Sequence, residues 1–225
     1  MWKKLLVLSP HADDAEIGCG GSIARTIAEG GEVCVALMTI GPVNFRHRGV
    51  VGSAERRGEF MASMRTLGVQ RTQVLSMDLD GGMYTAPHAE FVSKLDDLQD
   101  EFHPDAVLIP LPSSHQDHRY AWEVGLAATR PNASRHQPDM IAAYEYPQTS
   151  WGDGADSNAG KGGIYVDVTA HWESKLRALR EYETQMRGEG QLLSLEGVEA
   201  LGVLRGLEAG FGRAELFHAL RIRFA

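Results

Sequence analysis

The chain has 225 residues, of which 43% are hydrophobic and 23% charged, and 22 basic against 30 acidic side chains give a formal net charge of −8. This composition is typical of a globular protein and excludes disordered, collagen-like and coiled-coil chains. The acidic balance argues against non-specific binding to nucleic acid, which requires a basic surface.

The compartment and the domain organisation follow from what the sequence lacks. The two cysteines, Cys19 and Cys34, are too few for a disulfide framework, which favours the reducing cytoplasm. The N-terminal apolar run, Leu5–Leu8, is too short for an export signal, and no run is long enough to cross a membrane. We therefore expect a cytoplasmic protein that makes no membrane contact. Because no repeat or change of composition divides the chain, we expect one domain over residues 1–225.

Apolar runs of strand length alternate with helical patterns along the first part of the chain. In chain order we expect strand Leu5–Leu8, helix Ser22–Glu29, strand Val33–Ile40, helix Ala54–Leu67, strand Gln73–Met77, helix Ala89–Phe102, strand Ala106–Pro110 and helix Tyr120–Thr129. Ser53 is the expected N-cap of the second helix, and Gly68 is its expected stop. The alternation predicts an α/β, Rossmann-like fold with a largely parallel sheet flanked by helices on both faces.

The C-terminal third has a different pattern. We expect strand Ile141–Tyr146, a loop over Pro147–Gly163, strand Ile164–Val168, helices His171–Arg187 and Leu195–Leu207, and a last strand over Glu215–Ile222. The loop is rich in Gly, Ser, Asp and Asn, and a loop of that length inside a compact domain is usually functional or disordered.

A dense polar group follows the first strand, with His11, Asp13 and Asp14 ahead of a glycine-rich stretch. One interpretation is a helix N-terminus capped by one of the aspartates, with the glycines easing tight packing. A dinucleotide-binding turn requires a third glycine where Ile23 stands, and the second strand ends without an acidic residue for a ribose. Metal chemistry fits better, because histidine and aspartate in one turn offer N and O ligands that suit Zn²⁺.

A second polar group, His115, Asp117 and His118, directly follows the strand Ala106–Pro110. Ligands bind at the carboxyl ends of the strands in sheets of this kind, so we expect both groups at one sheet edge. A third ligand from the second group would leave an open position for water, the arrangement of a catalytic zinc ion.

With both groups in view, the chain resembles the LmbE-like, or PIG-L, family of zinc-dependent N-deacetylases. The resemblance rests on His11-x-Asp13-Asp14 with Glu16-x-Gly18 and on His115-x-Asp117-His118, with supporting matches at Arg56-x-x-Glu59, Tyr144-Glu145, Tyr182-x-x-Gln185 and Ala214-Glu215. It implies hydrolytic removal of the N-acetyl group from an N-acetylglucosamine-type sugar or its conjugate. It also implies a small-molecule partner, one Zn²⁺ per chain, with Fe²⁺ and Mn²⁺ as alternatives, and assembly into trimers or hexamers.

Carried over by position, the resemblance gives His11, Asp14 and His118 as the zinc ligands. Asp13 is then the general base that takes a proton from metal-bound water. Two neighbouring aspartates are needed for this division of roles, because a carboxylate that binds the metal is not free to accept a proton.

The resemblance gives His115 as the group that polarises the carbonyl or protonates the amine. We expect it to act in its protonated form, oriented by Asp117, and a direct metal bond from Asp117 is the alternative. Some members of the family carry a tyrosine that helps to hold the oxyanion at the position of Ser113, so a second oxyanion donor is unassigned here.

Three residues are candidates for binding the substrate: Arg56, Glu145 and Trp151. Arg56 either reaches the sugar or an anionic aglycone, or pairs with Glu59 one helical turn away. Glu145 either lines the pocket or is a buried, paired carboxylate. Trp151, in the long loop, is a candidate platform on which a sugar stacks.

Two other functions stay open at this level. A related amidase would cleave a bulkier N-acyl group or a mercapturate-type conjugate, and a preference among acyl chains would distinguish it. A binding module would keep the fold without the metal, and elemental analysis would reveal it.

Overall fold

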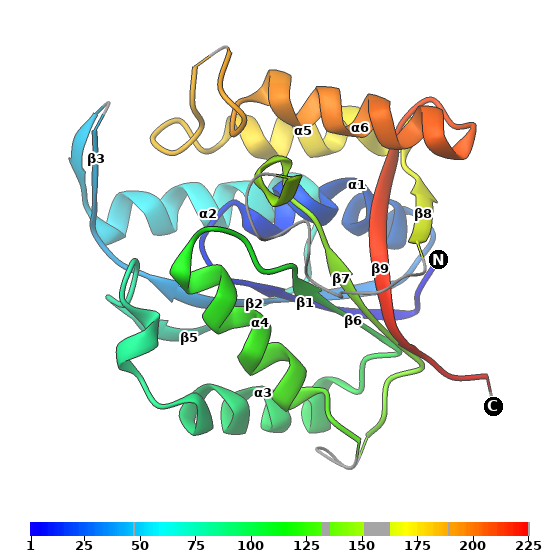
Figure 1. The fold of residues 1–225 in the computed structure, drawn as a ribbon, viewed down its shortest axis with the longest axis horizontal. Coiled ribbons are helices and arrows are strands. Elements are labelled where there is room, and N and C mark those ends of the chain that lie inside the picture. Colours follow the sequence, from blue (N-terminus) through cyan, green and yellow to red (C-terminus); the bar gives the residue numbers. More distant parts are fainter. Residues whose placement is uncertain (47, 132–135, 151–162, 189, 225) are drawn as a thin grey trace.

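The centre of the fold is a seven-stranded sheet with strand order β5-β2-β1-β6-β7-β9-β8 (Figure 1). This computed structural model describes residues 1–46, 48–131, 136–150, 163–188 and 190–224. Neighbouring strands from β5 to β7 pair in parallel, whereas β9 is antiparallel to both β7 and β8, which confirms the predicted α/β class. The strands are β1 Lys4–Ser9, β2 Glu32–Ile40, β5 Arg71–Met77, β6 Ala106–Pro110, β7 Met140–Tyr144, β8 Gly163–Asp167 and β9 Ala214–Ile222.

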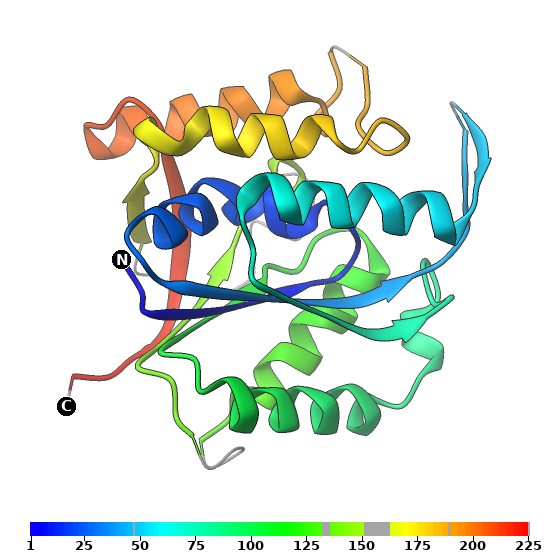
Figure 2. The same cartoon turned by 180° about the vertical axis from the view of Figure 1, so that it is seen from behind.

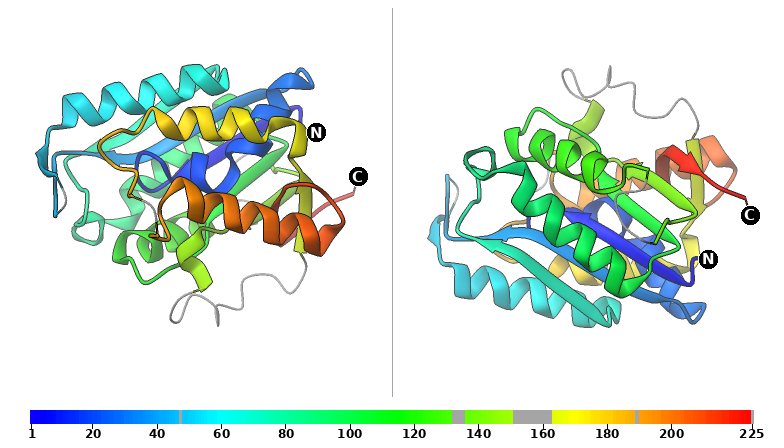
Figure 3. Two further views of the ribbon diagram at one scale, coloured as in Figure 1. Left: turned by 90° about the horizontal axis from the view of Figure 1, so that it is seen from above. Right: turned by 90° about the horizontal axis from the view of Figure 1, so that it is seen from below.

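Helices cover both faces of the sheet, as Figures 1 and 2 show. One face carries α1 (Asp14–Ala28) and α2 (Ser53–Leu67), with α5 (Trp172–Arg180) and α6 (Leu195–Ala209) above them. The other face carries α3 (His88–Phe102) and α4 (Gln116–Ala128), and Figure 3 shows both layers from above and below. The 3-10 helices in the described part of the chain are Met83–Thr85, Pro147–Ser150 and Thr169–His171. Among the described residues, no helix combines the length and the apolar character needed to span a bilayer.

The central strand β1 joins two hydrophobic cores. Successive side chains of a strand point to opposite faces, so Leu5 and Val7 pack into the core beneath α1 and α2. Leu6 and Leu8 pack into the core that α3 and α4 cover. Burying each of these side chains contributes about 1.5–3 kcal/mol to the stability of the fold. The loop that follows β1 therefore starts from a well-ordered strand.

The first helix begins earlier than the sequence indicates. We expected a glycine-rich turn up to Ser22, but α1 begins at Asp14 and contains the glycines, with a local break at Cys19. The glycines serve close packing, as the interpretation of a helix N-terminus predicted: a Cβ atom at Gly18 would overlap the buried ring of Tyr144, and one at Gly21 would press against Val168. Local chemistry suggested a turn, but contacts made far along the chain decide the conformation.

Other boundaries also differ from expectation. Ser53 is the first residue of α2 rather than its N-cap, which is Gly52, while Gly68 ends the helix in the left-handed conformation as predicted. A hairpin formed by β3 (Val43–Phe45) and β4 (Gly49–Val51) was not expected. Helix α4 begins at Gln116 rather than Tyr120, and α5 ends at Arg180, well before the expected Arg187.

Glycine 18 provides a test of this packing. We expect Gly18→Ala to lower the free energy of unfolding by about 1–3 kcal/mol, because the added methyl group has no room beside Tyr144. Gly58 is the matched control: it lies in α2, and a Cβ atom there would meet nothing within 4 Å. Gly58→Ala should therefore raise stability by about 0.5–1 kcal/mol. Urea unfolding of both variants checks the pair, and equal effects would contradict the packing argument.

Candidate active site

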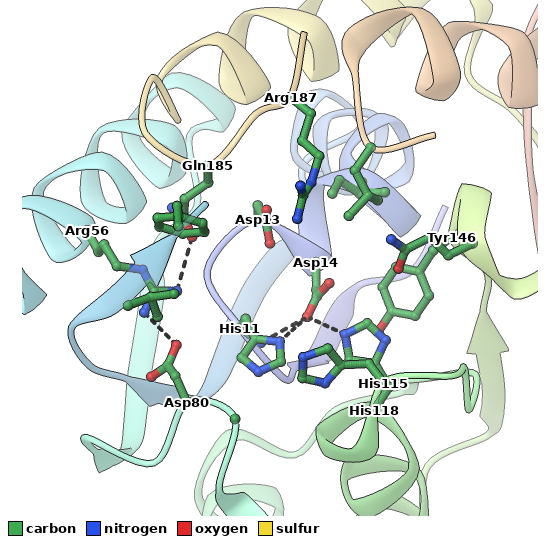
Figure 4. A pocket seen from close by; sticks show the side chains of 16 residues that line it. His11, Asp13, Asp14, Arg56, Asp80, His115, His118, Tyr146, Gln185 and Arg187 are labelled. Carbon is green, nitrogen blue, oxygen red and sulfur yellow. Dashed lines mark hydrogen bonds and ion pairs between the residues drawn. The ribbon is translucent and has the colours of Figure 1, made fainter. Parts of the chain in front are cut away.

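Two loops meet at one edge of the sheet. The first, with His11 and Asp13, follows β1 and leads into α1 at Asp14, and the second, with His115, follows β6 and leads into α4, whose first turn holds His118. β1 and β6 are parallel neighbours in register, with Leu5 opposite Ala106 and Val7 opposite Leu108, so their carboxyl ends lie side by side. The topology thus brings both polar groups together, as Figure 4 shows.

Three donor atoms converge at the centre of this site. Oδ2 of Asp14 lies 3.3 Å from Nδ1 of His11 and 3.4 Å from Nε2 of His118. Donor atoms of these three residues all lie within 4.8 Å of one another. Ligands of a tetrahedral zinc ion with bonds of about 2.0–2.1 Å are about 3.3 Å apart. The residues therefore fit a zinc ion in both chemistry and spacing.

The charges around the cluster also favour a cation. Burial by itself would raise the pKa of Asp14, but His118 and His11 hold it far below its ordinary value. Burial lowers the pKa of His11, yet Asp117 and Asp14 outweigh this effect and raise it to about 10. The site thus places carboxylate oxygens next to imidazole nitrogens. A cation bound between them would balance the negative charge of the carboxylates.

Asp117 is a second carboxylate within reach, but its oxygens are occupied. It is fully buried and contacts Nε2 of His11 at 2.9 Å. It also accepts the backbone N–H groups of Gly81 at 2.6 Å and Met83 at 3.2 Å. These bonds indicate that Asp117 orients His11 and does not itself bind a metal. His11, His115 and Asp117 nevertheless form a second group of closely spaced donor atoms.

His115 differs from expectation in its charge and in its partner. It caps α4, and its Nδ1 accepts the backbone N–H of Asp117 at 3.2 Å, so the Asp117 carboxylate does not orient it. Burial and the neighbouring His11 and His118 rings lower the pKa of His115 to about 4, which makes the ring neutral at pH 7. Because Nδ1 is an acceptor, the proton of the neutral ring is on Nε2.

Ser113 fixes the ring of His118. In the sequence, Ser113 was notable only because some members of the family have a tyrosine at this position. The buried Oγ of Ser113 lies 2.8 Å from Nδ1 of His118 and accepts the backbone N–H of His115 at 3.2 Å. This contact leaves Nε2 of His118 facing Asp14 and fixes the ring orientation. Partners of this kind behind a metal ligand raise metal affinity.

Asp13 adopts a strained backbone conformation with φ 105°. Such strain costs about 1–3 kcal/mol and persists only where neighbouring contacts enforce it. Here the Ser9 hydroxyl donates to the carbonyl of His11 at 2.7 Å and accepts the N–H of Ala15 at 3.1 Å, which pins the turn on both sides. As a result, Asp13 lines the pocket while Asp14 points to the histidines (Figure 4).

The surroundings of Asp13 make its carboxylate a stronger base. Burial, with the charges of Asp14 and Glu16, raises the pKa of Asp13 well above its ordinary value. The two neighbouring aspartates therefore differ strongly, since the pKa of Asp14 is shifted in the opposite direction. Such a pair is suited to distinct roles, one carboxylate as a fixed anion and the other as a proton acceptor.

These residues open into a pocket of about 270 Å³. On the side of α2 the buried Arg56 donates to the carbonyl of Gly41 at 2.6 Å, to Asp80 at 2.5 Å and to Gln185 at 3.1 Å (Figure 4). Arg56 thus lines the pocket without pairing with Glu59, which instead accepts hydrogen bonds from Thr184 and Gln185.

Sequence reasoning missed several residues that line the pocket, among them Asp80 and Tyr146, and gave Gln185 only as part of a supporting match. Asp80 carried a usable signal, because it is an acidic residue just after a predicted parallel strand. Tyr146 stacks on His118 with ring centroids 4.7 Å apart, a contact that no spacing in the sequence reveals.

One of the expected substrate residues is not found in the pocket. Glu145 does not line the pocket. Its buried carboxylate forms a bidentate ion pair with Arg205, whose Nε and Nη2 donate to the two carboxylate oxygens at 2.6 and 2.7 Å. The alternative of a buried, paired carboxylate is therefore the one the structure supports. Trp151 lies outside the described residues.

One family model and several known proteins are similar to the chain. A family model described as "PIG-L: GlcNAc-PI de-N-acetylase" matches residues 6–129, a segment that includes both loops of the site. A diacetylchitobiose deacetylase from Thermococcus kodakarensis is 32% identical to the chain over 195 residues, which are 81% of this chain and 70% of that protein.

Two further proteins are similar over nearly the whole chain. A 1D-myo-inositol 2-acetamido-2-deoxy-alpha-D-glucopyranoside deacetylase from Rhodococcus erythropolis is 26% identical over an alignment of 255 residues, covering 99% of this chain and 82% of that protein. The solved structure of N,N'-diacetylchitobiose deacetylase from Pyrococcus horikoshii has a TM-score of 0.77 at 26% identity, covering 97% of this chain and 84% of that chain.

The donor cluster predicts metal binding. We expect metal-depleted protein to bind one Zn²⁺ per chain in a calorimetric titration, and Asp14→Asn to weaken binding at least about 100-fold because it removes the central anionic ligand. His88→Gln is the control, since His88 is an exposed histidine paired with Glu123 outside the pocket. Unchanged affinity in Asp14→Asn would contradict the assignment of this cluster.

The contact behind His118 predicts a smaller effect. Ser113→Ala should weaken zinc binding about 10- to 100-fold while keeping one ion per chain, because the ligand ring loses its orienting partner. Ser114→Ala serves as the control, since Ser114 is the exposed neighbour outside the pocket lining. The same titration measures both variants, and equal affinities would show that Ser113 does not orient the ligand.

Proposed function

The chain belongs to the PIG-L family, and we propose on this basis that it is a metal-dependent hydrolase that removes the acetyl group from an N-acetylglucosamine-type sugar or its conjugate. The observation that carries the proposal is the convergence of His11, Asp14 and His118 on one point of the pocket, with the strained Asp13 beside them. The names of the Thermococcus and Rhodococcus relatives both describe deacetylation of an N-acetylated amino sugar.

His11, Asp14 and His118 would hold the metal, with zinc as the proposed ion. A metal bound there polarises the amide carbonyl and activates water for attack at neutral pH. Asp117 and Ser113 keep the two histidine rings in the orientation that ligation needs. Each ligand ring thus has its own partner on the far side from Asp14.

Asp13 is the proposed general base. It lines the pocket, is not part of the donor cluster, and has a raised pKa, so it is a stronger base than an ordinary aspartate. As the C–O bond to water forms, Asp13 accepts the proton of that water. It then returns a proton to the nitrogen as the C–N bond breaks, which releases acetate and a free amine.

His115 is the proposed oxyanion donor. Its Nδ1 is occupied by the N–H of Asp117, so its Nε2–H is the group available to the pocket. A neutral donor aimed at the carbonyl oxygen stabilises the negative charge that develops there. The role therefore needs no proton beyond the one the neutral ring already carries.

The wall beside α2 is the proposed sugar subsite. Asp80 and Gln185 offer an acceptor and an amide to sugar hydroxyl groups, and Arg56 holds both of them in place. The apolar side chains of Val43 and Phe45 from the β3–β4 hairpin face the same pocket. Apolar surface with a few fixed polar groups is the usual lining of a small-molecule site.

The substrate class is tested by acetate release. We expect the zinc-loaded protein to produce acetate and free amine in equal amounts from N-acetylglucosamine, diacetylchitobiose or N-acetylglucosaminyl-inositol, and a chelator to stop the reaction. Absence of acetate from all three compounds would refute the proposed substrate class. Faster release of longer acyl groups would identify a different amidase.

The role of Asp13 is tested by its amide. Asp13→Asn should lower the rate of acetate release about 10²- to 10⁴-fold, because a neutral amide cannot accept the proton. The zinc content should stay at one ion per chain, because Asp13 is outside the donor cluster. Asp97→Asn, on the exposed surface of α3, is the control. A metal-loaded Asp13→Asn protein with full activity would refute the mechanism.

A further inference from the structure

Glu59 is a half-buried carboxylate that the proposed mechanism leaves unused. It lies in α2 one helical turn after Arg56, whose guanidinium turns to other partners. We infer that Glu59 is a positioning residue for the sugar subsite: it fixes the side-chain amide of Gln185, which then offers a hydrogen-bond donor to the substrate. This inference deepens the proposed deacetylase function and rests on it.

Helix α2 presents a polar stripe toward the segment that follows α5. Residues three or four positions apart share one face of a helix, and the stripe consists of Arg56, Glu59, Ser63 and Thr66. At one end of the stripe, the hydroxyl of Thr66 donates to Glu181 at 2.9 Å. At the other end, Arg56 donates to Gln185 at 3.1 Å. The segment therefore runs antiparallel to α2 and is held at both ends of the stripe.

Both carboxylate oxygens of Glu59 accept hydrogen bonds from this segment. Oε1 accepts the backbone N–H of Thr184 at 2.7 Å. Oε2 accepts the hydroxyl of Thr184 at 2.6 Å and the side-chain N–H of Gln185 at 3.2 Å. Hydrogen bonds to an ionised acceptor are stronger than those between neutral groups. One carboxylate thus holds both the backbone of the segment and a side chain that lines the pocket.

The two neighbours of Gln185 determine which way its amide faces. A guanidinium only donates hydrogen bonds, and a carboxylate only accepts them. The amide oxygen therefore faces Arg56, as Figure 4 shows, and the amide nitrogen faces Glu59. That nitrogen carries two hydrogens, and Glu59 accepts one of them. The other N–H is left for a ligand in the pocket that Gln185 lines.

A fixed amide gives the subsite a defined pattern of donor and acceptor. Asp80, which Arg56 holds at 2.5 Å, supplies a carboxylate acceptor in the same pocket. A hydroxyl group both donates and accepts, so it matches a pair of this kind. A side chain that is already aligned also loses little freedom when a ligand binds. Without Glu59, Gln185 would be chemically unchanged but free to rotate, and only the binding of the sugar would suffer.

Kinetics of acetate release from N-acetylglucosamine and diacetylchitobiose separate binding from the chemical step. Zinc-loaded Glu59→Gln should raise KM about 5- to 10-fold and change kcat less than about twofold, because the lost contact serves ground state and transition state alike. Glu59→Asp, which keeps the carboxylate, should restore part of the affinity. Gln185→Leu should raise KM by a similar factor, and the double variant should be no worse. Glu55→Gln, at an exposed position of α2 outside the pocket, is the matched control.

A measurement on the amide itself tests the inference without any substrate. The side-chain amide of Gln185 gives a pair of signals in the proton–nitrogen correlation spectrum of isotope-labelled protein, and their loss in Gln185→Leu identifies them. In Glu59→Gln the proton that was bonded to the carboxylate should shift and should exchange faster with water. Glu55→Gln should leave both signals in place.

Unchanged amide signals in folded Glu59→Gln protein would overturn the inference. A fall in kcat at constant KM, or a loss of zinc, would also overturn it, since Glu59 would then act on the catalytic centre or on the fold. Fully additive effects of the two substitutions would contradict a role through Gln185. A wild-type protein that releases no acetate would instead refute the proposed function, and the amide signals would still decide whether Glu59 holds Gln185 in place.

Discussion

The site depends on one carboxylate oxygen, Oδ2 of Asp14, which lies within 3.4 Å of a nitrogen from each of two histidines. His11 follows β1 and His118 lies in the first turn of α4, so this oxygen joins segments that are far apart in sequence. A buried charge is stable only where donors or cations surround it. The backbone N–H of His11 and the two rings supply part of that environment, and a bound metal ion would supply the rest. The parallel pairing of β1 with β6 is what makes this meeting possible.

The backbone on either side of Asp14 places its carboxylate toward both histidines. Helix α1 begins at Asp14, and the tight turn before it has Asp13 in the strained conformation with φ 105°. Ser9 bonds both sides of that turn. The strain separates two adjacent carboxylates into different surroundings, and their pKa values move in opposite directions. A pair of acids with divergent pKa values can combine a fixed anion with a mobile proton.

Sequence patterns predicted the parts of this structure that depend on local periodicity and on strand order. Alternating strands and helices gave the parallel sheet, and the rule that ligands bind at strand ends placed the two loops together. The predicted helix Ser22–Glu29 starts too late, whereas the alternative of a helix N-terminus at the aspartates agrees with the structure. The partner of Gly18, the ring of Tyr144 across the core, could not be read from the local sequence. Asp117 was assigned to its neighbour in sequence, but its carboxylate contacts His11 from the other loop. Glu145 pairs with Arg205, sixty residues later, and no spacing rule reveals such a partner.

The donor cluster and the opposite wall of the pocket come from different parts of the chain. The donor cluster rests on the ends of β1 and β6, whereas the opposite wall belongs to the segment after α5, which is fixed to α2 through Glu59. Within it, Gln185 turns inward to Arg56, and Arg187, two residues on, faces the pocket. A side chain on an anchored backbone needs little further ordering to bind a ligand. Side chains of this segment therefore face the donor cluster from an anchored backbone.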